Sequence, residues 1–291
     1  MRIPVFYSTA LAGPNPNQAK CLPVVGLLKR EFGPENFVHM ISPSEEPTAQ
    51  VLTSLTKVLH HIHDEAYLRG IFMEDKKDGY GETDGSNLDS IMTALCCWSA
   101  AVKEVCEGKA FCAMAPVGGF HHARYASGGG YCTFNGLMLG ERMAATKYDR
   151  QAGILDMDEH YGDGTADIID KLRLNTPHST LGLWKDARGV PMFGRSVVDR
   201  IPAEIGRLVA EGADILFYQA GADPHIDDPL GGRMSTEELR ARDRLVFQTC
   251  RNLRLPVVWC LAGGYQGVEI VSQLHATTYR EAMEVFDGFD R

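Results

Sequence analysis

The amino-acid sequence predicts an α/β fold: a single-domain, three-layer sandwich in which helices cover both faces of a mostly parallel central sheet. Short, nearly continuous apolar runs alternate along the chain with amphipathic segments, which is the order of successive βα units. The runs lack the apolar–polar alternation of a strand with one exposed face, so we expect both faces to be buried. No repeat or low-complexity linker interrupts the chain, and we therefore expect one domain, 1–291.

Six apolar segments have the length and composition of buried strands. They are Val5–Tyr7, Phe111–Ala115, Gly153–Met157, Leu181–Leu183, Asp214–Tyr218 and Pro256–Leu261. Between them, residues rich in glycine and proline at 78–85, 127–130 and 224–232 are typical of loops rather than of domain borders.

Four segments carry helix signals. One apolar helical face consists of Val51, Leu55, Val58, Leu59 and Ile62, and a second of Leu88, Ile91, Met92, Leu95, Trp98 and Val102. Asn87 is the expected N-cap of the second helix. Ser235 and Glu238 form a capping-box pattern ahead of a third helix, and Val268 to Phe286 is expected to form the closing helix.

Bulk properties exclude several classes of protein. A formal charge of −9 and a pI near 5.6 argue against nucleic-acid binding, which needs clustered Lys and Arg. Neither a signal peptide nor an apolar run of about 20 residues is present, so we expect no membrane span and a cytoplasmic location. The eight cysteines form no Cys-x-x-Cys pair and should be reduced and packed. The sequence leaves a homo-oligomer open.

Polar residues follow four of the predicted strands. The His121–His122 pair follows the strand ending near Ala115, and Asp158 and His160 follow the one ending near Met157; Asp223 and Tyr265 each follow a later strand. In an open α/β sheet, ligands bind beyond the carboxyl ends of the strands. These side chains are therefore expected to converge on one pocket.

The converging residue types fit a metal-dependent hydrolase. One imidazole and two carboxylates are a plausible catalytic ligand set, because three protein ligands leave a coordination position open. Each residue alone has an ordinary alternative: Asp223 as a turn residue, a histidine pair as surface or core polarity, and Tyr265 as an exposed loop residue. The alternatives weaken only when all the groups are considered together.

Four ordered blocks resemble the histone deacetylase superfamily, which includes acetylpolyamine amidohydrolases and bacterial deacetylase-like proteins and shares its fold with arginase. The matching blocks are Pro116–Gly136, Asp156–Gly164, Gln219–Asp223 and Leu261–Tyr265. The resemblance implies an arginase/deacetylase-like sheet and one zinc ion, with iron(II) as the alternative, held by Asp158, His160 and Asp223.

The resemblance also implies roles for the remaining polar residues. His121 and His122 are similar to the family's tandem histidines, with Asp156 and Asp163 as their respective carboxylate partners. His122 would take a proton from the attacking water and pass one to the leaving amine, while His121 would act mainly through its charge. Tyr265 would donate a hydrogen bond to the developing oxyanion.

Gly130 and Tyr131 match the family's substrate channel, in which Tyr131 would form an aromatic wall, although a buried aromatic is also ordinary core. Tyr161 stands where many relatives carry a second histidine. The family's ligand is the preceding histidine, here His160, so the implied metal site is unaffected. Gly182 and Trp184 stand where relatives often carry Ser and His, so the resemblance does not extend to the family's monovalent-cation site.

The ureohydrolase branch of the same fold, which needs two bridged manganese ions, is less consistent with this sequence. That branch carries another Asp two residues after the ligand histidine, where this chain has Gly162. Three spare ligands, His225, Asp227 and Asp228, follow Asp223, but residues of this kind in a turn-rich segment usually serve the loop. A mononuclear site is therefore expected.

The expected function is hydrolysis of an acyl amide to a carboxylate and a free amine. The substrate would be an acylated lysine side chain or a small acylated amine such as an acetylpolyamine, and the acidic net charge favours a small cation. The alternative is a catalytically silent protein of the same fold that binds an acyl amine or a metal. A binding protein does not need a base and an oxyanion donor together.

Overall fold

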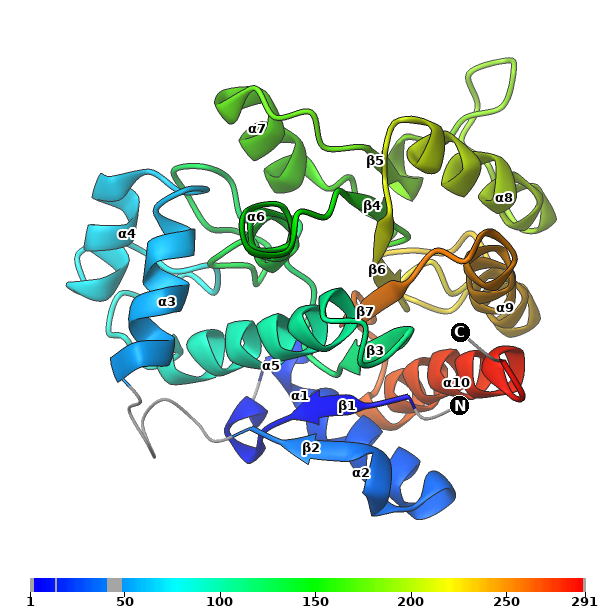
Figure 1. Ribbon diagram of the computed structural model, residues 1–291, viewed down its shortest axis with the longest axis horizontal. Helices are drawn as coiled ribbons and strands as arrows, with labels where there is room; N and C mark the ends of the chain where they lie inside the picture. The colour runs from blue at the N-terminus through cyan, green and yellow to red at the C-terminus, as the bar shows by residue number, and fades with distance from the viewer. Residues whose placement is uncertain (1–2, 14, 41–48, 290–291) are drawn as a thin grey trace.

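The computed structural model describes residues 3–13, 15–40 and 49–289, and its central feature is a parallel sheet of seven strands (Figure 1). The strands are β1 Val5–Tyr7, β2 Phe37–His39, β3 Cys112–Ala115, β4 Ala152–Asp156, β5 His178–Thr180, β6 Ile215–Gly221 and β7 Val257–Ala262. Their order across the sheet is β2-β1-β3-β7-β6-β4-β5, and every adjacent pair is parallel. The predicted α/β fold is confirmed.

Helices cover both faces of this sheet (Figure 1). They are α1 Pro16–Ala19, α2 Cys21–Phe32, α3 Ala49–Leu59, α4 Glu65–Phe72, α5 Leu88–Cys106, α6 Gly136–Tyr148, α7 Asp163–Leu172, α8 Arg195–Ala210, α9 Thr236–Leu253 and α10 Val268–Phe286. Three 3-10 helices, η1 Thr9–Leu11, η2 Pro34–Asn36 and η3 Leu181–Leu183, complete the described elements. One apolar cluster joins the sheet to α3 to α7, and the other joins it to α2, α8, α9 and α10.

Successive residues of the central strands belong to opposite clusters. On β6, Phe217 packs with α5 through Trp98, while Leu216 and Tyr218 belong to the cluster on the α9 side. All seven residues of β6 and all six of β7 are buried. Side chains that alternate between two buried faces explain why these strands are apolar throughout their length.

One predicted strand is wrong. Leu181–Leu183 forms the 3-10 helix η3, and the strand β5 lies just before it, at His178–Thr180. The chain turns at Gly182, where an added Cβ would lie 2.7 Å from the backbone nitrogen of Tyr161, so this segment packs against the loop that follows β4 instead of extending the sheet. The other five strands are confirmed with ends shifted by at most three residues. The short, partly exposed edge strand β2 was not predicted.

The predicted helices are present, with differences at their ends. The Ser235–Glu238 capping box opens α9, and α10 spans the predicted residues. Asn87 precedes α5 as expected, but its side-chain amide donates to Asp78 at 3.0 Å instead of capping the helix. Ile62 lies beyond the end of α3, although it is buried. Val51 lies in α3, but its side chain is outside the described residues.

All eight cysteines lie within the described residues, and no disulfide joins any of them. Seven are buried and Cys106 is partly buried, which confirms the expectation of reduced, packed thiols. Within residues 3–13, 15–40 and 49–289, no helix combines the length and apolar composition that crossing a bilayer requires.

Candidate metal centre and active site

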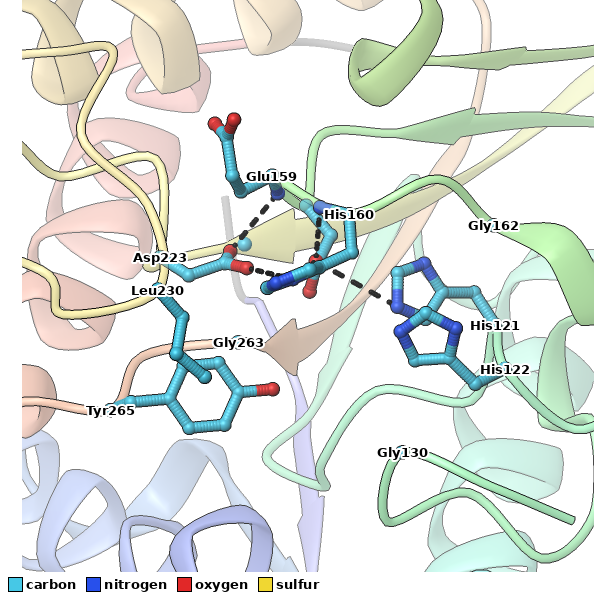
Figure 2. A network of polar contacts seen from close by, with 12 residues as sticks. His121, His122, Gly130, Glu159, His160, Gly162, Asp223, Leu230, Gly263 and Tyr265 are labelled. Carbon is cyan, nitrogen blue, oxygen red and sulfur yellow. Dashed lines mark hydrogen bonds and ion pairs between the residues drawn. The ribbon is translucent and has the colours of Figure 1, made fainter.

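Asp158, His160 and Asp223 come together beyond the carboxyl ends of the neighbouring strands β4 and β6 (Figure 2). Nδ1 of His160 lies 2.9 Å from Oδ2 of Asp223 and 3.2 Å from Oδ1 of Asp158. One potential ligand atom from each residue lies within 4.8 Å of the other two. Among the described residues, this is the one group of His, Cys, Asp and Glu side chains with that geometry.

Local backbone contacts orient the two carboxylates. The backbone N–H of His160 donates to Oδ1 of Asp158 at 3.0 Å, and the N–H of Glu159 donates to Oδ1 of Asp223 at 3.2 Å. Gly263 closes the site from β7: its φ is +50°, and an added Cβ would lie 2.2 Å from Oδ1 of Asp223. Only glycine fits this close approach to the carboxylate.

The donor set fits a divalent cation. Asp158 is 2% exposed and Asp223 is fully buried. Burial and the adjacent Asp158 carboxylate raise the pKa of Asp223, while hydrogen bonds to Asp158 and Asp223 raise the pKa of His160 to about 10. Two buried carboxylates repel each other, and a bound cation would offset this repulsion. Two oxygen donors and one imidazole suit zinc or iron(II).

Of the three spare ligands after Asp223, His225 and Asp228 make hydrogen bonds that hold the loop and its neighbours, whereas the Asp227 side chain is exposed. Nε2 of His225 lies 2.8 Å from the Thr236 hydroxyl, and its Nδ1 accepts from the backbone N–H of Asp227. Asp228 accepts the backbone N–H of Leu230 at 2.9 Å through Oδ1. These contacts match the predicted loop role and stabilise the segment from 224 to 232.

At Gly162, where a ureohydrolase would carry a further Asp, an added Cβ would lie 2.5 Å from Oδ2 of Asp156. A side chain at this position would collide with the carboxylate that accompanies His121. Gly162 itself supplies no carboxylate, so the further ligand of the ureohydrolase branch is missing at this position.

Each histidine of the tandem pair contacts its own carboxylate. Nδ1 of His121 lies 2.8 Å from Oδ2 of Asp156, and Nδ1 of His122 lies 2.6 Å from Oδ1 of Asp163. The two ring centroids are 4.0 Å apart, and the His122 ring lies 6.1 Å from that of His160. Both histidines therefore face the three-donor cluster with their Nδ1 atoms occupied (Figure 2).

The two histidines differ in burial and charge. His121 is 3% exposed; although burial opposes its charge, the carboxylates of Asp156 and Asp158 raise its pKa to about 9. His122 is half-buried, and burial followed by the neighbouring His121 charge lowers its pKa. In the metal-free chain at neutral pH, these shifts favour a cationic His121 and a neutral His122, and a neutral imidazole can accept a proton.

Tyr265 follows β7 on a backbone that turns at two glycines, Gly263 and Gly264, both with positive φ. Its backbone N–H donates to Oδ2 of Asp228 at 2.7 Å, and its ring centroid lies 6.2 Å from that of His160. Figure 2 shows its hydroxyl pointing into the space between the metal ligands and His122. Burial, together with the charges of the ligand carboxylates, raises the pKa of the phenol, which keeps it a donor.

Tyr131 reaches the site from a different segment, and its ring lies beside that of Tyr265. Its ring centroid is 6.4 Å from that of Tyr265 and 5.9 Å from that of Tyr80. At the preceding Gly130, φ is +52° and an added Cβ would lie 2.4 Å from Cδ2 of His122. The segment thus brings an aromatic ring next to Tyr265 and backbone next to His122.

Several residues that shape the site were not singled out from the sequence. Gln219 accepts the Phe120 N–H through Oε1 at 3.0 Å and donates to Oδ1 of Asp156 at 3.2 Å, which links the histidine loop to β4. The ammonium group of Lys20, which is 2% exposed, donates to the carbonyl of Gly263. A lone glutamine or lysine inside an apolar segment gives no sequence signal of such a role.

Glu159, between two proposed metal ligands, forms an ion pair with Arg233 that was also not predicted. Nε of Arg233 lies 2.6 Å from Oε2 of Glu159, and its Nη1 donates to the carbonyl of Met192 at 3.3 Å. The guanidinium also lies over the Phe193 ring, 5.8 Å from its centroid. These contacts join three loops at the carboxyl edge of the sheet.

Comparison with known proteins gives results that agree with this geometry. A family model described as the histone deacetylase domain matches residues 28–178, a span that includes both histidines of the tandem pair and the candidate ligands Asp158 and His160. Asp223 and Tyr265 lie outside the matched span.

Three relatives illustrate the similarity. An uncharacterized protein of Picosynechococcus sp. is 30% identical over 190 residues, which cover 58% of this chain and 61% of that protein. Type-2 histone deacetylase 2 of Dictyostelium discoideum is 29% identical over 212 residues, which cover 57% of this chain and 12% of that protein. The acetoin utilization protein AcuC of Staphylococcus aureus is 27% identical over 138 residues, which cover 44% of this chain and 36% of that protein. The chain therefore spans less than two thirds of the length of each of these relatives.

The family model covers just over half of the chain, and the fold it implies is the parallel α/β sheet described above. The matched segment contributes both histidine–carboxylate pairs and two members of the three-donor cluster, Asp158 and His160. On these grounds, the chain belongs to the histone deacetylase family.

Proposed function

We propose that this chain is a metal-dependent deacylase that hydrolyses the acyl amide of a lysine side chain or a small amine to a carboxylate and a free amine. The observation that carries the proposal is the position of the His122–Asp163 pair, with its 2.6 Å contact, beside the buried donor set of Asp158, His160 and Asp223. Such an arrangement combines a base with a cation site, as metal-dependent amide hydrolysis requires.

Asp158, His160 and Asp223 would hold zinc or iron(II), which supplies polarisation of the amide carbonyl and a lower pKa for water. His122, neutral at pH 7 and oriented by Asp163, accepts the proton of the attacking water and later delivers a proton to the leaving amine. Asp163 fixes the tautomer that leaves Nε2 of His122 available.

Two further groups act on the developing negative charge. His121, held by Asp156 and cationic at neutral pH, contributes a fixed positive charge next to His122. The hydroxyl of Tyr265 donates a hydrogen bond to the oxyanion from the side opposite the histidines. Because Tyr265 stays protonated, this donation does not depend on pH in the neutral range.

The substrate would pass along Tyr131 and Tyr265, whose ring centroids are 6.4 Å apart and would have to separate to admit a methylene chain between them. Two aromatic faces suit the methylene chain that links an amide to the rest of a lysine or polyamine. The net charge of −9 favours a cationic substrate such as an acetylpolyamine over a neutral one. The relatives named histone deacetylase support the same type of bond as the one cleaved here.

The alternative is a catalytically silent protein of the same fold that binds an acyl amine or a metal. One experiment separates the two functions. The full chain is stripped with a chelator, reloaded with Zn²⁺ or Fe²⁺, and assayed for amine release from acetyl-lysine and acetylpolyamine reporters. Deacylation that needs the metal and disappears again with chelator supports the enzyme.

A matched pair of variants shows whether turnover belongs to this site. His122→Asn removes the proposed base, whereas His178→Asn changes a partly buried histidine at the amino end of the edge strand β5. We expect loss of turnover in the first variant and ordinary turnover in the second. Metal binding without turnover of either reporter under both metals would favour the silent alternative.

A further inference from the structure

The buried face of α9 contains two charged residues among apolar ones. Leu239, Val246 and Phe247 pack on the sheet, and Arg242 and Asp243, three and four residues after Leu239, lie on the same face. Each of the two charged residues is only 2% exposed. Burying an ion pair costs several kcal/mol of desolvation, so apolar residues of similar volume are often equally or more stabilising. A stability role alone does not explain why charges stand here.

The guanidinium of Arg242 reaches through the end of the sheet to two backbone carbonyls. Its Nη1 donates to the carbonyl of Gly221 at 2.6 Å and to that of Met157 at 3.3 Å. On its other side, Nε and Nη2 each lie 2.8 Å from Oδ1 of Asp243. One planar group therefore holds the backbone of two segments and its own counter-ion.

Asp243 fixes the position of the guanidinium. Its Oδ1 also accepts the hydroxyl of Tyr218 on β6, and its Oδ2 accepts the hydroxyl of Thr278 on α10 at 2.7 Å. The carboxylate is thus anchored to a strand and to a second helix, in addition to Arg242. A closed network of this kind has little freedom to shift.

The two carbonyls stand at the ends of the strands that supply the proposed metal ligands. Met157 directly precedes Asp158, and Gly221 is two residues before Asp223. The paired register of β4 and β6 ends at Asp156 and Gln219, so both carbonyls lie beyond it. At Gly221 the backbones are so close that an added Cβ would lie 2.5 Å from Cα of Asp158.

We propose that Arg242 is a positioning residue for the metal centre: its fork fixes the spacing of the Met157 and Gly221 carbonyls and thereby the spacing of the two ligand carboxylates. This inference rests on the proposed metal-dependent function. A methionine at this position would fill the volume without donating to either carbonyl. A lysine would keep the charge but has a single donor group in place of the planar fork.

The test uses the full chain with Arg242→Met, Arg242→Lys and a control, Arg240→Met. Arg240 lies on the same helix and forms an ion pair with Glu281 at 3.0 Å, away from the two carbonyls. Zn²⁺ affinity is measured by competition with a chromogenic chelator, the Co²⁺ absorption spectrum reports ligand geometry, and thermal unfolding in chelator reports the fold without metal.

We expect Zn²⁺ affinity to fall about 10- to 100-fold in Arg242→Met, as for other groups that orient metal ligands. Arg242→Lys should also bind more weakly and show an altered Co²⁺ spectrum, whereas Arg240→Met should match the unmodified chain. The thermal midpoint in chelator should change far less in the Arg242 variants than the affinity does.

The outcomes separate this inference from the function on which it rests. If the unmodified chain binds no Zn²⁺, both the proposed function and the positioning role are overturned. If the unmodified chain binds Zn²⁺ tightly, and folded Arg242→Met and Arg242→Lys bind it with the same affinity, only the positioning role is overturned. If Arg242→Met is unfolded, the double variant Arg242→Met/Asp243→Asn removes both charges and keeps an oxygen for Tyr218 and Thr278. Unfolding of every Arg242 variant would assign the residue to core stability and reject the positioning role.

Discussion

Replacing Tyr265 by phenylalanine removes a single hydroxyl from the site and leaves its surroundings in place. The backbone N–H remains bonded to Asp228 at 2.7 Å, and the ring remains between Tyr131 and His160, with centroid distances of 6.4 Å and 6.2 Å. The change is therefore limited to one hydrogen-bond donor. Loss of one oxyanion donor costs about 10²- to 10³-fold in kcat, or about 2.7–4 kcal/mol of transition-state stabilisation.

Steady-state kinetics with an acetylated reporter measure this loss. The oxyanion forms only during the reaction, so kcat and kcat/KM should fall together while KM and Zn²⁺ affinity stay near their original values. Burial and the ligand carboxylates raise the pKa of Tyr265, so the phenol is a donor throughout the range from pH 7 to 9. The ratio of kcat in Tyr265→Phe to kcat in the unmodified chain should therefore be constant across that pH range.

Tyr161→Phe is the matched control, because Tyr161 follows the ligand His160 but is 39% exposed. This variant should keep turnover close to that of the unmodified chain. Unchanged kcat in Tyr265→Phe would remove the phenol from the mechanism. A rise in KM alone would reassign Tyr265 to substrate binding.

Three further predictions concern the metal ligands and the fold. Asp158→Ala should abolish metal uptake by elemental analysis, and full metal content would mean that the ligands are wrongly assigned. Gly263→Ala should weaken Zn²⁺ binding in the chelator competition, because its Cβ would lie 2.2 Å from the Asp223 carboxylate, while Gly267→Ala, whose Cβ meets nothing within 4 Å, should not. Burial lowers the pKa of His63 from 6.5 to about 4, so the unfolded chain takes up this proton first. The stability that neutral His63 contributes should be complete above pH 6.5 and should fall by about 3 kcal/mol toward pH 4. Urea unfolding in the presence of chelator, at several pH values, measures this loss of stability. The free energy of unfolding should fall less steeply with decreasing pH in His63→Gln, and an identical fall would show that His63 is not its source.

The sequence predicts the centre of the fold better than its edges. β6 and β7 are buried on both faces, so nearly every residue is apolar and the strands are visible as continuous runs. β2 has three residues on the edge of the sheet, two of them exposed, and carries no such pattern. The segment at Leu181–Leu183 looks like a strand because it is apolar, but its turn depends on contact with the backbone at Tyr161, which is distant in sequence.

The candidate site could be predicted where a motif is local. His121 and His122 are adjacent, and Asp158 and His160 are two residues apart, so their convergence needs only the order of the strands. Groups that approach from other elements could not be predicted in this way. Arg242 is the partial exception, because a charged pair on the apolar stripe of a helix is visible in the sequence, but its target carbonyls are not.

The burial of the cysteines has a practical consequence for metal analysis. Zinc binds thiolates well, and a chain with eight cysteines could take up metal away from the carboxylate–imidazole site. In the folded chain, seven of these sulfur atoms are shielded from solvent, and burial raises the pKa of Cys21 and Cys106 to about 11, so thiolate is scarce. A stoichiometry of about one zinc per folded chain would then report the proposed centre, and an excess would mark preparations in which part of the protein has opened.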